Sequence, residues 1–173
     1  HIPNPEDGAA MEAACRMVRD SGADAGVILD ADCDRAAIVD HTGKEINRNR
    51  LIAMISAILL DEAPGATIVT DSVTSSGLSD FIREWGGEHY RYKRGYRNVI
   101  DEAVRLNQAG IDCPLAIETS GHAALRDNHF LDDGMYLVMD AWTGTSSLVS
   151  DIILYDEATG FLQPYRPSGM SDI

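Results

Sequence analysis

A short acidic segment, Asp30-Ala31-Asp32-Cys33-Asp34-Arg35, carries the side chains of this sequence that are best suited to bind a metal ion. Its three carboxylates alternate along the chain directly after the apolar run Gly26-Val27-Ile28-Leu29, which is typical of a buried strand. Two unit charges about 4 Å apart at an effective dielectric of about 20 repel by about 4 kcal/mol, so three anions on one loop favour a compensating cation. Oxygen ligands indicate a hard ion, Mg²⁺ first and then Ca²⁺ or Mn²⁺.

Two other interpretations of this segment are a solvated acidic turn and an EF-hand. The solvated turn stays open, because acidic residues often close strands and cap helices. An EF-hand requires glycine at the sixth loop position and glutamate at the twelfth, where this sequence has Arg35 and His41. It also requires a helix before the loop, whereas the apolar run predicts a strand.

A second segment is basic, although the net charge of the chain is -14. Five of the 14 basic residues fall there: Arg91, Lys93, Arg94, Arg97 and Arg105. Gly95 lets the backbone approach a ligand, and the helix expected after it offers free N–H groups. The segment Lys93-Arg94-Gly95-Tyr96-Arg97 therefore suits a phosphate or another anion. The alternative is that the basic side chains pair with acidic residues on the surface.

A third segment, Glu118-Thr119-Ser120-Gly121-His122, follows another apolar run and combines a carboxylate, hydroxyls and an imidazole. Such a set can hold sugar hydroxyls and move protons. A Ser-His hydrolase is a weaker interpretation, because Gly-x-Ser-x-Gly is absent and residues two apart rarely form a nucleophile–base pair. A strand cap with a structural histidine is the remaining alternative.

Helical and strand patterns alternate along the chain. The expected helices cover residues 6–19, 49–62, 77–85 and 96–109, the expected strands cover 25–30, 36–39, 66–70, 88–92 and 114–118, and Asp132-Asp133-Gly134 predicts a turn with a helix cap. This order predicts an α/β fold with mixed, mainly parallel sheets flanked by helices. Ligands bind such folds at the carboxyl ends of strands, where Asp30, Asp71 and Glu118 are expected.

The composition indicates a folded core within 173 residues, of which 45% are hydrophobic. A polar stretch at residues 44–50 predicts a domain boundary, which divides the chain into residues 1–47, residues 48–147 and an unassigned tail, 148–173, without periodicity. The chain begins at His1 without an initiator methionine, which indicates a fragment.

Charge and cysteine usage narrow the partners and the compartment. The negative net charge argues against a nucleic-acid partner, and no apolar run reaches the roughly 20 residues of a membrane span. Three cysteines without a Cys-x-x-Cys pair fit a reducing compartment, so a cytoplasmic location is expected.

Taken in order, the three polar segments resemble the α-D-phosphohexomutase superfamily, the phosphoglucomutases and phosphomannomutases. The second domain of that family carries an Asp-x-Asp-x-Asp-Arg loop that binds Mg²⁺, which residues 30–35 match. Its third domain carries a Glu-x-Ser-Gly-His sugar-recognition loop, which residues 118–122 match. Residues 93–100 are similar to a glycine-centred basic segment of the family, and residues 126–134 to the stretch after the sugar loop. The resemblance covers the chain from about residue 1 to 145, the remainder of a second domain plus a third.

The resemblance implies a reaction that interconverts hexose 1-phosphate and hexose 6-phosphate, with glucose or mannose as the sugar. A phosphoserine gives its phosphoryl group to the sugar, a bisphosphate intermediate reorients, and Mg²⁺ offsets charge at the transferring group. The implied metal ligands are Asp30, Asp32 and Asp34. The implied catalytic residues are Arg35 near the phosphoryl oxygens and His122 as a proton carrier, and the implied substrate contacts are Glu118, Ser120, His122, Lys93 and Arg97.

Two family features are missing from the sequence: the Ser-His-Asn-Pro nucleophile loop of the first domain and the Arg-x-Ser-Gly-Thr phosphate loop of the final domain. In addition, Val73 stands where some relatives have a lysine or arginine. We therefore expect part of a mutase, an isomerase that lacks its nucleophile, is inactive alone and has the first and fourth domains as partners. The alternatives are a stand-alone module that binds sugar phosphate and Mg²⁺, and a Mg²⁺-dependent phosphatase with an aspartate nucleophile in the acidic segment.

Overall fold

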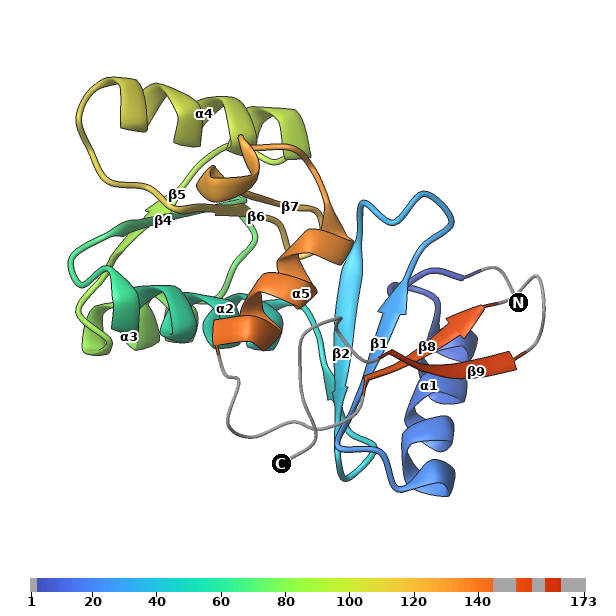
Figure 1. Ribbon diagram of the computed structural model, residues 1–173. Helices are drawn as coiled ribbons and strands as arrows, with labels where there is room; N and C mark the ends of the chain where they lie inside the picture. Colours follow the sequence, from blue (N-terminus) through green and yellow to red (C-terminus); the bar gives the residue numbers. More distant parts are fainter. Residues whose placement is uncertain (1–2, 145–151, 157–160, 166–173) are drawn as a thin grey trace.

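The computed structural model describes residues 3–144, 152–156 and 161–165, which form two α/β units that lie side by side (Figure 1). The helices are α1 (Gly8–Ser21), α2 (Asn49–Glu62), α3 (Ser76–Glu84), α4 (Tyr96–Gln108), α5 (Gly134–Gly144) and a short 3₁₀ helix, η1 (Arg126–Asn128). The strands are β1 (Ala25–Leu29), β2 (Ala36–Asp40), β3 (Glu45–Ile46), β4 (Thr67–Thr70), β5 (Glu88–Arg91), β6 (Leu115–Ile117), β7 (Ala123–Leu125), β8 (Ile152–Asp156) and β9 (Phe161–Tyr165).

The first unit is a sheet with the strand order β3-β2-β1-β8-β9, and α1 packs against β1 and β2. The antiparallel pair of β1 and β2 is a hairpin whose connection is the acidic segment. Asp7 caps the start of α1, because its side chain accepts hydrogen bonds from the Ala9 and Ala10 amides, and the helix buries Met11 and Val18 against Val39 of β2. This packing holds the strand end before the acidic segment in place.

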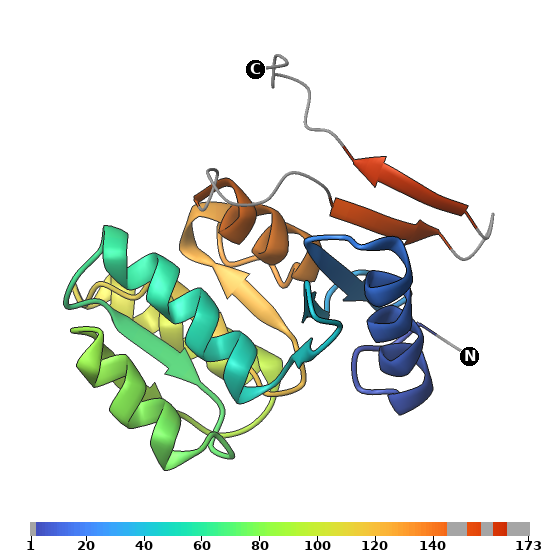
Figure 2. The same cartoon turned by 90° about the horizontal axis from the view of Figure 1, so that it is seen from below.

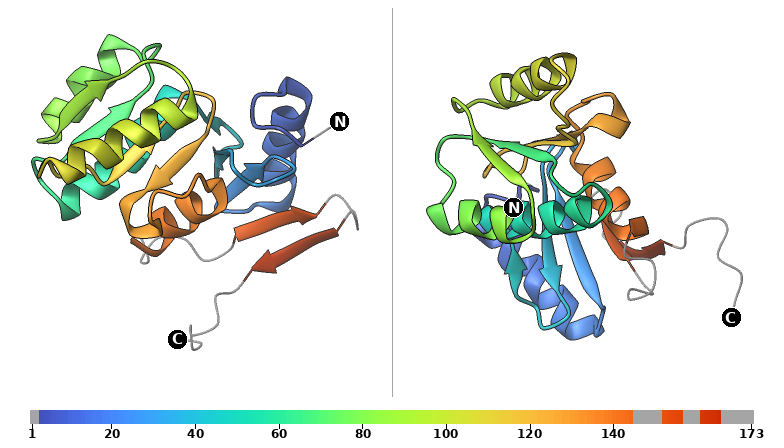
Figure 3. Two further views of the ribbon diagram at one scale, coloured as in Figure 1. Left: turned by 90° about the horizontal axis from the view of Figure 1, so that it is seen from above. Right: turned by 90° about the vertical axis from the view of Figure 1, so that its left-hand side faces the viewer.

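The second unit is a sheet with the order β5-β4-β6-β7, in which β5, β4 and β6 are parallel and β7 is antiparallel to β6. Helices α2 and α3 cover one face and α4 covers the other (Figures 2 and 3). The apolar stripe of α2, with Leu51 and Ile55 fully buried, packs in one core with Ile68 of β4 and Leu115 of β6. The predicted fold class is confirmed, and its parallel pairs lie mainly in this second sheet.

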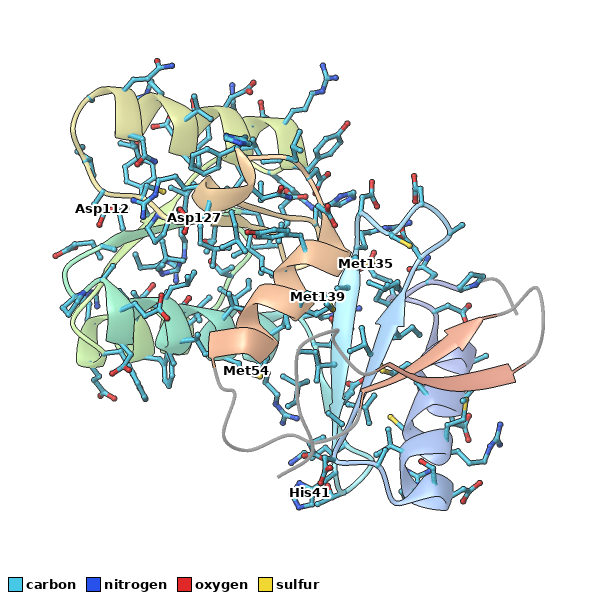
Figure 4. The ribbon with its side chains drawn as sticks, in the orientation of Figure 1. His41, Met54, Asp112, Asp127, Met135 and Met139 are labelled. Atoms are coloured by element: carbon cyan, nitrogen blue, oxygen red, sulfur yellow. The ribbon has the colours of Figure 1, made fainter. Side chains whose placement is uncertain are left out.

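Helix α5 lies between the two units and contacts β2, β7 and α2. Met135 and Met139 mark its course beside the first sheet in Figure 4. Gly134 allows the close approach at its first turn, because a Cβ atom there would lie 2.7 Å from the carbonyl carbon of Arg35. None of the helices in the described part of the chain combines the length and the apolar character that crossing a membrane requires.

The structure adds strands that the sequence pattern does not predict. Strands β3 and β7 have two and three residues, which is too short for a periodicity to be visible. Strands β8 and β9 lie within the unassigned tail, and β8 pairs in parallel with β1. Asp30, Asp71 and Glu118 do follow the last residues of β1, β4 and β6.

Candidate functional site

Two hairpin loops meet where the units touch: the acidic loop, residues 30–35 between β1 and β2, and the Glu118 loop, residues 118–122 between β6 and β7. Arg35 and His122 form an isolated antiparallel bridge, and the Ala36 amide donates a hydrogen bond of 3.2 Å to the Gly121 carbonyl. Gly121 has a φ of 99°, and a Cβ atom there would lie 2.9 Å from the Ala36 carbonyl oxygen. Glycine is therefore required at this contact.

Asp30 is buried and is held by Arg35 within the acidic loop. Its Oδ1 accepts a hydrogen bond of 3.1 Å from the Arg35 amide, and its Oδ2 lies 2.5 Å from Arg35 Nε. Burial alone would raise the pKa of Asp30, but the two hydrogen bonds and the charge of Arg35 outweigh it and lower that pKa. The loop therefore holds an ionised carboxylate at the end of β1.

The three carboxylates of the acidic loop form a donor set for a divalent cation. One oxygen each from Asp30, Asp32 and Asp34 lies within 4.8 Å of the others. Burial raises the pKa of Asp34, and the neighbouring carboxylates add to this effect against the opposing influence of His122. A set of hard oxygen donors whose charges repel fits Mg²⁺ or a similar ion. The predicted metal ligands are thus brought together in space.

His122 lies between the acidic loop and the start of α5. Its Nδ1 is 2.8 Å from Asp132 Oδ2 and 3.6 Å from Asp34 Oδ2, and its ring stacks on Tyr96 with a centroid distance of 4.9 Å. Burial would lower the pKa of His122, but the hydrogen bond to Asp132 and the charges of Asp132 and Asp34 raise it. The sequence pattern predicted only a turn at Asp132 and did not reveal that this side chain contacts His122.

Glu118 is buried, and both of its carboxylate oxygens have partners. Oε1 accepts a hydrogen bond of 2.6 Å from the Gly95 amide, and Oε2 accepts one of 3.2 Å from the Ser120 hydroxyl. Glu118, His122 and Tyr96, together with Val99 and Ile117, line a crevice that is too small to admit a water molecule. The structure therefore brings Glu118, Ser120 and His122 together and places them against the first turn of α4.

The Glu118 loop is also anchored from β4. Asp71 is completely buried, and its Oδ2 accepts hydrogen bonds from the Thr119 amide at 2.8 Å and the Thr119 hydroxyl at 2.7 Å. Its Oδ1 accepts a further bond of 2.9 Å from the Val73 amide. Asp71 therefore connects the loop after β4 with the loop after β6. The sequence placed Asp71 at a strand end but did not reveal this connection.

The basic segment divides into structural and exposed residues. Arg91 donates hydrogen bonds to Thr74, Ser75 and Ser79, and Arg105 pairs with the buried Glu102. Pairing with an acidic residue therefore holds for Arg105, whereas Arg91 is held by two hydroxyls and a backbone carbonyl. Lys93 and Arg97 are exposed on either side of Gly95, and Lys93 Nζ lies 5.5 Å from the centroid of the Tyr92 ring. Their assignment as anion contacts stays a prediction.

Comparisons with known proteins agree with this geometry. The family model "Phosphoglucomutase/phosphomannomutase, alpha/beta/alpha domain II" matches residues 1–43, and the model for domain III of the same family matches residues 47–148. A phosphomannomutase/phosphoglucomutase from Pseudomonas putida is 31% identical over 137 residues, which are 79% of this chain and 28% of that protein. A phosphoglucosamine mutase from Cereibacter sphaeroides is 36% identical over 126 residues, 72% of this chain and 27% of that protein.

The solved structures extend the similarity to three dimensions. A phosphoglucomutase/phosphomannomutase family protein from Burkholderia thailandensis has a TM-score of 0.70 at 26% identity, and the match covers 89% of this chain and 35% of that chain. The chain thus spans between about a quarter and a third of the length of the relatives it matches. It belongs to the phosphoglucomutase/phosphomannomutase family, and its matches fall in domains II and III.

Proposed function

We propose that this chain supplies the metal-binding and sugar-recognition loops of a phosphohexomutase that interconverts hexose 1-phosphate and hexose 6-phosphate. The observation that carries the proposal is the contact between the two loops, which places His122 Nδ1 3.6 Å from Asp34 Oδ2. A cation held by the acidic loop and a sugar held by the Glu118 loop would therefore be neighbours. The names of the relatives, phosphomannomutase/phosphoglucomutase and phosphoglucosamine mutase, support a hexose phosphate as the substrate.

The acidic loop would serve the phosphoryl group. Asp30, Asp32 and Asp34 would hold Mg²⁺, which when bound offsets negative charge at the transferring group. Arg35 pairs with Asp30 through its Nε, which would hold one ligand in place, and the other N–H groups of its guanidinium would contact the phosphoryl oxygens. This pairing lets a buried carboxylate stay ionised whether or not the cation is bound.

The Glu118 loop would serve the sugar. Glu118 would accept hydrogen bonds from sugar hydroxyls, and Ser120 would donate hydrogen bonds to them. Lys93 and Arg97 would contact the phosphate that is not transferred. Because His122 Nδ1 is engaged by Asp132, Nε2 is the nitrogen left to take a proton from the attacking hydroxyl and return it. Its stacking on Tyr96 restricts the orientation of the ring.

The chain would need the first and fourth mutase domains to complete the reaction. Removal of a covalent nucleophile eliminates the reaction path itself, so we expect negligible turnover from this chain alone. A phosphatase that uses Asp30 as nucleophile is less compatible with the geometry, because both oxygens of Asp30 accept hydrogen bonds from Arg35.

A mutase assay tests the proposal on this chain and on the same chain joined to a first and a fourth mutase domain. The substrates are glucose, mannose and glucosamine 1-phosphates, with Mg²⁺ and a bisphosphate activator. We expect activity only in the completed protein, and a loss of at least about 100-fold in kcat for His122→Ala in that protein. Turnover by the short chain, or none in a completed protein that folds, would overturn the proposal.

A further inference from the structure

A second group of metal-binding side chains lies beside the acidic loop and has a different donor chemistry. It consists of Asp34, His122 and Asp132, each of which offers one ligand atom within 4.8 Å of the other two. His122 Nδ1 is 2.8 Å from Asp132 Oδ2 and 3.6 Å from Asp34 Oδ2. In a tetrahedral zinc site with bonds of about 2.1 Å, neighbouring ligand atoms are about 3.4 Å apart. Small side-chain movements would therefore convert this group into a three-ligand site.

An unsatisfied oxygen points to a missing partner at the same place. Asp132 Oδ1 is buried and accepts no hydrogen bond within the described part of the chain, where Ser56 Oγ is the other such atom. A buried carboxylate oxygen without a partner is costly, and a cation bound by Asp132 would compensate it. This observation is independent of the distances among the three residues.

The backbone holds the three ligands in place before any ion binds. The residue next to Asp34, Arg35, forms a bridge with His122, and Asp132 forms a second isolated bridge with Ala124 of β7. The side chains are also partly shielded, with exposures of 31% for Asp34, 18% for His122 and 15% for Asp132. Preorganised ligands lose less conformational entropy when they bind a metal.

We propose that Asp34, His122 and Asp132 form a second divalent-cation site that selects metals with affinity for imidazole, such as Zn²⁺ and Co²⁺. The acidic loop offers oxygen alone and therefore suits Mg²⁺ or Mn²⁺, whereas a nitrogen ligand favours later transition metals. Because Asp34 belongs to both sets, occupancy of one site weakens the other. The second site is inferred from distances and burial alone and stands if the proposed function fails, although an ion bound there would occupy Asp34 and His122.

The first test is a titration of the full chain with Co²⁺, followed by visible absorption, and with Zn²⁺, followed by calorimetry. We expect Asp132→Ala to weaken Co²⁺ and Zn²⁺ binding by at least about tenfold, because it removes one of three ligands. The matched control is Asp127→Ala, which removes an exposed aspartate that pairs with Arg126 on the second unit (Figure 4) and is not one of the three ligands, and should leave both affinities unchanged. Equal Zn²⁺ affinity of the wild-type chain and Asp132→Ala would overturn the proposal.

The second test separates the two sites. Asp32→Ala should weaken Mn²⁺ binding, measured by electron paramagnetic resonance, while Zn²⁺ binding persists. Zn²⁺ binding that disappears with Asp32→Ala and survives His122→Ala would place the ion in the acidic loop and contradict the proposal.

A third measurement needs no variant and so does not depend on whether variants fold. In the wild-type chain labelled with ¹⁵N-histidine, Zn²⁺ should shift the Nδ1 resonance of His122 more than that of any other ring nitrogen. A shift confined to Nε2 of His122, or to another histidine, would contradict the assignment.

Discussion

The acidic loop and the Glu118 loop have the same local architecture, but the buried carboxylate at the start of each loop is held differently. Each connects two antiparallel strands, β1 with β2 and β6 with β7. In the acidic loop the buried carboxylate of Asp30 is held from within by Arg35, five residues later, while the Cys33 carbonyl accepts hydrogen bonds from the Gly134 and Met135 amides of α5. The Glu118 loop is held from outside, by Asp71 at the end of β4 and by the Gly95 amide before α4.

This difference predicts which substitutions change binding and which change folding. The exposed Asp32 can be removed without disturbing the acidic loop, because the pair of Asp30 and Arg35 holds that loop without it. The supports of the Glu118 loop cannot be removed in this way, because each connects elements that are far apart in sequence. Three substitutions and one change of pH test this distinction, from the largest expected effect to the smallest.

Asp71→Ala should lower the free energy of unfolding by about 3 kcal/mol. Three donors, the amides of Val73 and Thr119 and the Thr119 hydroxyl, lose a buried acceptor, at about 1 kcal/mol each. Urea denaturation measures the change, and Asp71→Asn, which keeps one carbonyl oxygen, should lose less. A loss below about 1 kcal/mol for the alanine variant would mean that the Glu118 loop is not supported from β4.

Gly134→Ala should lower the free energy of unfolding by about 2 kcal/mol, because its Cβ would overlap the backbone of Arg35 where the two units meet. Gly8→Ala is the matched control, since Gly8 is also the first residue of a helix but a Cβ atom there would have no neighbour within 4 Å. That change should be neutral or stabilising by up to about 1 kcal/mol. Equal thermal stability of the two variants would contradict the close contact.

Asp32→Asn should weaken the binding of Mg²⁺ or Mn²⁺ by at least about tenfold, or about 1.4 kcal/mol, because it removes a charged ligand. The free energy of unfolding should stay within about 0.5 kcal/mol of the wild-type value, because Asp32 is exposed. Calorimetry and urea denaturation on the same samples give both numbers. A destabilisation comparable to that of Asp71→Ala would erase the distinction between the two loops.

Acid should destabilise the second unit through His89 of β5, whose ring lies between the hydroxyls of Thr70 in β4 and Ser79 in α3. Burial, together with the charges of Arg91 and Arg83, lowers the pKa of His89 to about 4. As the pH falls, His89 binds a proton in the unfolded chain before it does so in the folded chain. Its contribution to stability is therefore fully present above about pH 6.5 and is lost as the pH drops toward 4.

The contribution of His89 should be about 1 kcal/mol, since the ring is partly exposed. The difference in unfolding free energy between pH 7 and pH 4 measures it, by comparison of the wild-type chain with His89→Gln. His41→Gln, at the exposed turn after β2 (Figure 4), is the control and should leave the pH dependence unchanged. An identical pH dependence in His89→Gln and the wild-type chain would contradict the prediction.

The sequence predicted the parts of the site that depend on local pattern. An apolar run followed by polar residues located the ends of β1, β4 and β6, and therefore placed Asp30, Asp71 and Glu118 correctly. The resemblance then identified which loops belong together. These signals work because a buried strand and the loop after it are contiguous in the chain.

The long-range partners could not be predicted in this way. The contact of Asp132 with His122, the bond between Gly95 and Glu118, and the stacking of Tyr96 on His122 all join separate elements. Asp132 had a sufficient local explanation as part of a turn, and Gly95 as the residue before a helix. Spacing along the chain carries no information about which strand ends become neighbours until the sheet order is known.

The bridge between Arg35 and His122 also has a kinetic consequence. Closing a loop between such distant segments costs entropy before its contacts can form, whereas each hairpin closes over a few residues and forms early. We therefore expect both hairpins to exist in the folding chain before they meet. Asp34 and His122, which belong to different loops, would come together in the last folding step. Ligand binding would therefore measure the docking of the two units and not their individual folding.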